Sequence, residues 1–188
     1  MNNLLKKSIK KYQKVQDLAY GVQKLSNKIR TKSKEAIALL RRDNIKESKK
    51  NIKETEELFK LINKIIKKNR ELLNQSFYKE AVEEYIEAIT YFNFLTSSKT
   101  KIPDFIKVGA EEIISGTCDF TGELVRRAVT IANLKNLQDL TLYQKAVENV
   151  AQELTKVGFR GKLRQKYDEV ERNLRKLEDI LYDIKLKK

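Results

Sequence analysis

The chain has 188 residues, of which 40 are basic and 26 acidic, and its formal net charge is +14. It contains no histidine and a single cysteine, Cys118. This composition excludes histidine-dependent nucleophilic sites, zinc sites built from histidine or several thiolates, and an intramolecular disulfide. Any catalysis must therefore use carboxylates, lysine, tyrosine, serine, threonine or a bound metal ion.

The excess of positive charge favours a polyanionic partner. Nucleic acid is the first candidate and an anionic membrane surface is the second, while a solubilised cationic surface is the plain alternative. No apolar run approaches the roughly 20 residues that span a bilayer, and the start lacks the apolar core of a signal peptide. Together with the lone cysteine, this predicts a cytoplasmic protein that does not enter the membrane.

Six glycines and one proline, beside 40% apolar residues, favour long helices over sheets. The length suits one domain over residues 1–188. Apolar residues recur at spacings of three and four, which is typical of amphipathic helices. Helices are predicted over residues 9–29 (continuing to 42 beyond a break near Ser26–Asn27), 45–73, 76–95, 105–134, 140–158 and 163–184. Asp104, after Pro103, is expected to cap the fourth of them.

The segment "EEYIEAITYF" places Glu84 and Glu87 in a helix that is apolar on nearly all sides. Such a helix is usually buried, and side chains three residues apart lie about 5–6 Å from each other. Two buried carboxylates repel each other, so the pattern predicts that both bind one Mg²⁺ or Mn²⁺ ion. The alternative is that arginine or lysine from a neighbouring helix neutralises them.

A second acidic pair, Asp119 and Glu123, occurs in "CDFTGELVRR". By itself it fits a solvated polar stripe in which Glu123 pairs with Arg127. If the two helices face each other, however, four carboxylates converge inside one bundle. That arrangement predicts a metal site but does not separate a nuclease from a metal-storage protein.

Basic residues offer candidate contacts to phosphate. They occur in "KKSIKK", at Arg41–Arg42, and in "KKNR" at 67–70, although each run taken alone more often forms a solvated face. Arg126 and Arg127 stand next to the second acidic pair.

The two acidic motifs and their surroundings resemble a known family. "EEYIEAITYFNFL", followed by "SGTCDFTGELVRRAV", is similar to the translin superfamily, and specifically to its translin-associated factor X branch. The segment "RTKSKEAIALLRR" and the ending "LRQKYDEVERNLRKLEDILYDIKLK" extend the resemblance over nearly the whole chain. The chain lacks the long insertion that eukaryotic members carry between the two motifs, which suggests a compact prokaryotic-type member.

The resemblance implies an all-α fold of six to seven helices that assembles into a closed octamer around nucleic acid. It further implies a metal-dependent endoribonuclease for single-stranded RNA, with single-stranded DNA as a further ligand. Glu84, Glu87 and Asp119 match the family's catalytic acids, which would bind Mg²⁺ or Mn²⁺, and Glu123 matches a neighbouring acidic position. The subunit could form a homo-octamer, another closed homo-oligomer, or a mixed assembly with a second translin-like chain.

Three hypotheses follow from these observations. The first is a metal-dependent endoribonuclease. The second is a non-catalytic shell that binds single-stranded RNA or DNA, which needs the positive charge but not the carboxylates. The third is a structural helical protein with no nucleic-acid role.

Overall fold

The computed structural model describes residues 2–67, 69–132 and 137–186, and these residues form helices joined by turns and loops. In chain order the elements are α1 (Asn2–Arg41), α2 (Ile45–Ile66), the 3₁₀ helix η1 (Arg70–Asn74), α3 (Ser76–Thr96), α4 (Ala110–Ala132), α5 (Leu137–Leu154) and α6 (Gly161–Leu186). No strand occurs within the described ranges, so the predicted all-α fold is confirmed. None of the helices that the structure describes has both the length and the apolar character that crossing a bilayer requires.

Two predicted boundaries in the first half of the chain were wrong. α1 runs without a break through Ser26, whose small side chain is fully buried. α2 ends at Ile66 rather than near Leu73. The Asn69 side chain accepts a hydrogen bond from the backbone N–H of Glu71, and this cap begins a separate 3₁₀ helix.

The fourth helix also begins later than predicted, at Ala110. Asp104 is not its cap. Instead, Glu112 reaches back and accepts a hydrogen bond from the backbone N–H of Gly109 at 2.9 Å. A glutamate in the first turn that satisfies a free N–H just before the helix stabilises this start. The predicted end at residue 134 lies outside the described residues.

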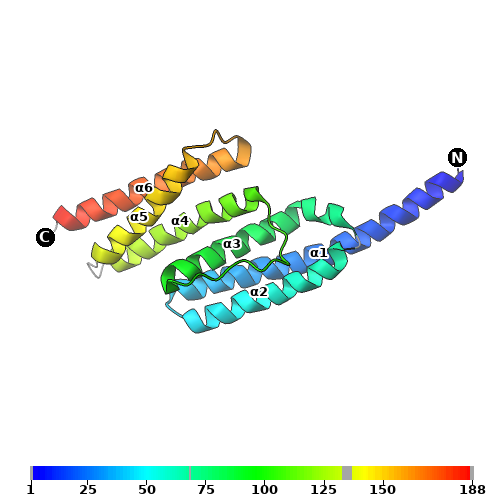
Figure 1. Ribbon diagram of the computed structural model, residues 1–188, viewed down its shortest axis with the longest axis horizontal. Coiled ribbons are helices and arrows are strands. Elements are labelled where there is room, and N and C mark those ends of the chain that lie inside the picture. The colour runs from blue at the N-terminus through cyan, green and yellow to red at the C-terminus, as the bar shows by residue number, and fades with distance from the viewer. Residues whose placement is uncertain (1, 68, 133–136, 187–188) are drawn as a thin grey trace.

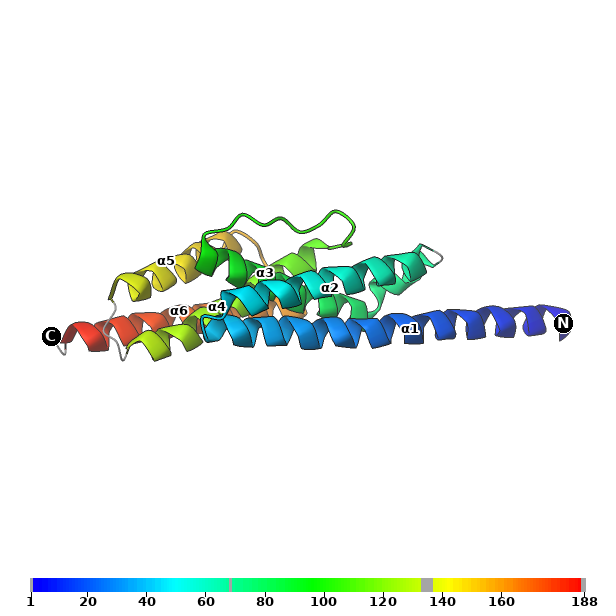
Figure 2. The same ribbon diagram turned by 90° about the horizontal axis from the view of Figure 1, so that it is seen from below.

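The helices pack in a chain of neighbours, with α1 against α2 and α3, α3 against α4, and α4 against α5 and α6 (Figure 1). The N-terminal half of α1 extends well beyond the rest of the molecule (Figure 2). Its apolar residues Leu4, Leu5, Ile9 and Tyr12 are exposed. Because α3 packs directly against α4, these two helices lie side by side in the body of the protein, as a shared acidic site requires.

Close approach of α3 and α4 depends on Gly116. A Cβ atom at this position would lie 2.5 Å from the backbone oxygen of Glu83 and 2.8 Å from the Cβ of Ile86. We expect Gly116→Ala to lower the free energy of unfolding by about 1–3 kcal/mol, because α3 and α4 would have to separate. Urea denaturation measures this change.

Gly122 provides a matched control in the same helix. There the nearest atom to an added Cβ is 3.7 Å away, an ordinary contact. Gly122→Ala should be neutral, or stabilise by up to about 1 kcal/mol through helix propensity. Equal unfolding free energies for the two variants would contradict the tight contact at Gly116.

Candidate active site

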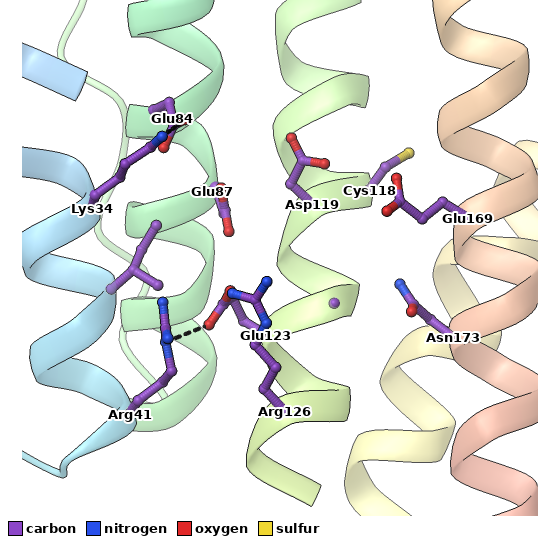
Figure 3. A pocket seen from close by; sticks show the side chains of 12 residues that line it. Lys34, Arg41, Glu84, Glu87, Cys118, Asp119, Glu123, Arg126, Glu169 and Asn173 are labelled. Atoms are coloured by element: carbon purple, nitrogen blue, oxygen red, sulfur yellow. Dashed lines mark hydrogen bonds and ion pairs between the residues drawn. The ribbon is translucent and has the colours of Figure 1, made fainter. Parts of the chain in front are cut away.

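Both acidic residues of the α3 motif face one cavity. It has a volume of about 400 Å³ and is bordered by α1, α3, α4 and α6 (Figure 3). α3 is held in place by buried side chains around its circumference, among them Tyr85, Tyr91 and Ile86. The spacing of three directs Glu84 and Glu87 to the same side, where both line the cavity.

The α4 pair lines the same cavity, so the structure brings all four predicted acids together. The expectation of a solvated stripe was wrong for Glu123, which is only 3% exposed and pairs with the side chains of Arg41 and Arg126. Its predicted partner Arg127 lies elsewhere. Glu123 instead accepts a hydrogen bond from Arg126 at 2.6 Å, and its second oxygen lies 2.8 Å from Nε of Arg41.

Basic side chains neutralise two more of the acids. Glu84 forms an ion pair with Lys34 of α1 at 3.2 Å. Asp119 pairs with Lys166 of α6 through a short hydrogen bond. Neutralisation by a neighbouring helix, the alternative for the α3 pair, is therefore present at Glu84, and Asp119 and Glu123 of α4 are neutralised in the same way.

Glu87 is the exception, since it makes no ion pair or hydrogen bond within the described residues. Its pKa is raised to about 8, mainly by burial and then by the charges of Asp119, Glu123 and Glu84, while Lys166 acts in the opposite direction. Burial also raises the pKa of Asp119 and that of Glu123, although their basic partners lower them. When Glu87 is ionised, therefore, no basic side chain pairs with it among the described residues.

The cavity suits a hard divalent cation in its chemistry. Its carboxylate oxygens are the ligands that Mg²⁺ and Mn²⁺ favour, and the unpartnered Glu87 is the group such an ion would stabilise most. Within the described ranges, however, no three acidic or thiol side chains are gathered closely enough to form a ready coordination set. Binding would therefore require Lys34 and Lys166 to release their carboxylates and the acids to turn inward.

α6 supplies two cavity residues that no sequence motif indicated, Glu169 and Asn173 (Figure 3). Lys166 belongs with them, because it contacts Asp119 from the same helix. No short-range spacing links these positions to the two acidic motifs, which lie more than 40 residues away. Only the packing of α6 against α4 brings them to the site.

The four arginines predicted to contact nucleic acid separate into different environments. Arg41 and Arg126 line the cavity and bind Glu123. Arg42 lies exposed in the turn after α1. Arg127 is a structural residue, because its half-buried guanidinium donates hydrogen bonds to Tyr143, to the Leu40 carbonyl and to Asp43.

Comparisons with known proteins agree with this architecture. The model of the Translin family matches residues 9–188. The translin-associated protein X homolog of Schizosaccharomyces pombe is 28% identical over 189 residues, which cover 90% of this chain and 82% of that protein.

Solved structures share the fold over nearly the whole chain. The crystal structure of apo-NeC3PO has a TM-score of 0.83 at 20% identity and covers 96% of this chain and 96% of that one. The structure of an AfC3PO–duplex RNA complex has a TM-score of 0.85 at 19% identity, covering 98% and 97% respectively. The crystal structure of AfC3PO has a TM-score of 0.83 at 22% identity, with 98% of both chains covered.

Proposed function

This chain belongs to the Translin family, and from that premise we propose that it is a metal-dependent endoribonuclease acting on single-stranded RNA. One observation carries the proposal. Glu84, Glu87 and Asp119, from two different helices, line a single cavity with Glu123. A non-catalytic binding protein has no need to gather four carboxylates beside a substrate that is itself anionic.

In this proposal the residues around the cavity have different roles. Glu84, Glu87 and Asp119 would hold Mg²⁺ or Mn²⁺, with Glu123 as a fourth ligand or as an anchor for the two arginines. A bound ion supplies a water molecule of lowered pKa and offsets charge on the scissile phosphate. Arg41 and Arg126, at the border of the cavity, would attract and orient the phosphate group.

A closed assembly is part of the proposal. The exposed apolar side chains on the projecting half of α1 are an unpartnered surface of the kind that a second subunit covers. We expect a homo-octamer or another closed homo-oligomer, unless a second translin-like chain completes it. Light scattering that reports only a monomer would contradict this part of the proposal.

The proposal is tested by incubating the purified chain with labelled single-stranded RNA, with and without Mn²⁺, and measuring product sizes on a gel. Duplex RNA of the same sequence is the comparison substrate, since the AfC3PO structure is of a complex with duplex RNA. We expect internal cleavage of the single strand only in the presence of Mn²⁺.

The basic partners of three carboxylates favour a second candidate, a non-catalytic protein that binds single-stranded RNA or DNA. In that case the acids would serve only to anchor α1 and α6 to α3 and α4. Undiminished RNA binding without any cleavage, over a full range of Mg²⁺ and Mn²⁺ concentrations, would establish this alternative and overturn the first.

A further inference from the structure

A second cavity lies away from the acidic site and has the opposite charge. We call it the basic groove, a space of about 700 Å³. Its lining residues are Lys60, Asn63, Lys64, Ile66, Lys67, Arg70, Leu73, Phe105 and Lys107. They belong to α2 and its C-cap Lys67, to η1 and to the loop that follows α3, whereas the acidic cavity is bordered by α1, α3, α4 and α6. In Figure 2 this loop and α6 lie at opposite edges of the molecule.

The charge of the basic groove is largely unneutralised. Five of its nine lining residues are cationic, and no carboxylate lines it in the part of the chain that the structure describes. The side chains of Lys64, Lys67 and Arg70 are exposed and form no ion pair or hydrogen bond with other described residues. Lys60 differs, since it pairs with the exposed Glu57 at 2.6 Å. Such a concentration of free cations attracts an anionic ligand.

The cations are arranged in a row beside an aromatic ring. Lys60 and Lys64 lie on α2, and Lys67 is its C-cap residue with helical backbone angles. The spacing of four and three therefore places the three lysines on one face over about 10 Å of the helix axis. The half-buried ring of Phe105 lines the same space, with the Lys60 ammonium 5.4 Å from its centre. Asn63 donates a hydrogen bond to the Phe105 carbonyl, which fixes this part of the loop against α2.

We propose that the basic groove binds a segment of single-stranded polynucleotide, with successive phosphates along Lys60, Lys64 and Lys67 and a base stacked on Phe105. A row of cations suits several phosphates rather than one, and an aromatic side chain beside a positively charged track is the combination that binds unpaired bases without sequence preference. Duplex nucleic acid offers no free base face to the ring. The groove is thus an anchoring site for a strand, separate from the acidic cavity, and does not depend on the cleavage proposed there.

The test measures binding of a fluorescent single-stranded DNA oligonucleotide to the full chain by anisotropy at several salt concentrations. Lys64→Gln/Lys67→Gln should weaken binding about tenfold or more and lower the slope of log K against log salt by about 1.4, at about 0.7 per phosphate contact. Phe105→Leu should weaken binding by about fivefold or more through lost stacking, with the salt slope unchanged. Circular dichroism checks that each variant is folded.

The matched control is Lys145→Gln/Lys176→Gln, which removes the same charge from exposed positions of α5 and α6. Equal losses in the control and the groove variant would overturn the proposal, because general charge would then explain the binding. Competition by free UMP, duplex DNA or polyglutamate as effective as that by unlabelled single strand would overturn it too.

A footprint on the unmodified protein keeps the test valid if a variant fails to fold. The bound oligonucleotide should protect Lys64 and Lys67 from acetylation while Lys145 stays reactive, as mass spectrometry reports. Unprotected lysines in the groove at saturating oligonucleotide would contradict the proposal. Since the probe is DNA and the readout is binding, a failure here leaves the RNA cleavage assay of the acidic site unaffected.

Discussion

Glu87→Gln and Asp119→Asn are each expected to reduce Mn²⁺-dependent RNA cleavage about a hundredfold or more, while RNA binding changes little. Each substitution keeps the size of the side chain but removes the negative charge that would hold the ion. Loss of a few kcal/mol of transition-state stabilisation corresponds to a change of this size. The measurement is the initial rate of cleavage of labelled single-stranded RNA, with binding followed separately in the absence of metal.

Glu83→Gln is the matched control for these variants. Glu83 neighbours Glu84 on α3, pairs with Lys162 at 2.7 Å and accepts a hydrogen bond from Ser115 at 3.1 Å. It therefore resembles Asp119 in having a lysine partner from α6, but it does not line the acidic cavity. Cleavage should persist in this variant. Undiminished rates in both Glu87→Gln and Asp119→Asn would refute the assignment of these acids.

The sequence predicted the parts of the site that depend on local periodicity. The apolar surroundings of Glu84 and Glu87 indicated a buried α3, and both acids do face a cavity within the bundle. Their meeting with Asp119 required only that α3 and α4 be neighbours. Consecutive elements are usually adjacent in space, and Gly116 permits the close approach.

The sequence could not predict which cation pairs with which carboxylate, because that depends on contacts between distant segments. Arg127, four residues after Glu123, seemed its natural partner, yet Tyr143 and Asp43 bind Arg127 from α5 and from the turn after α1. Lys166 lies 47 residues from Asp119 and reaches it only through the packing of α6 on α4. Long flexible side chains among 40 basic residues leave many pairings open until the helices are placed.

The unpartnered Glu87 gives the second large effect, a dependence of stability on pH and metal. Its pKa in the folded protein is about 8, against an ordinary value of 4.5. Between these values the folded state holds a proton that the unfolded state has lost. The stability this group contributes is therefore fully present below pH 4.5 and is lost as the pH rises through 8, by at most about 1.4 kcal/mol per pH unit.

Glu87→Gln should reduce the decrease of the unfolding free energy with rising pH, because the amide cannot ionise. The variant should be more stable than the unmodified protein at pH 8 and similar to it at pH 4.5. Asp119 and Glu123, whose pKa values are also raised, leave a smaller slope of the same sign. Urea denaturation across this range measures both curves, and Glu83→Gln should retain the full slope. Parallel curves for Glu87→Gln and the unmodified protein would show that Glu87 ionises normally.

Mn²⁺ should reverse the loss, because an ion bound to ionised Glu87 replaces the proton and offsets the repulsion from Asp119 and Glu84. The rise in melting temperature on adding Mn²⁺ is therefore expected to be larger at pH 8 than at pH 6, where the proton competes with the ion. Glu87→Gln should lose most of this rise at both pH values. If Mn²⁺ stabilises the variant and the unmodified protein equally, the ion binds elsewhere and Lys166 alone balances the charge at Asp119.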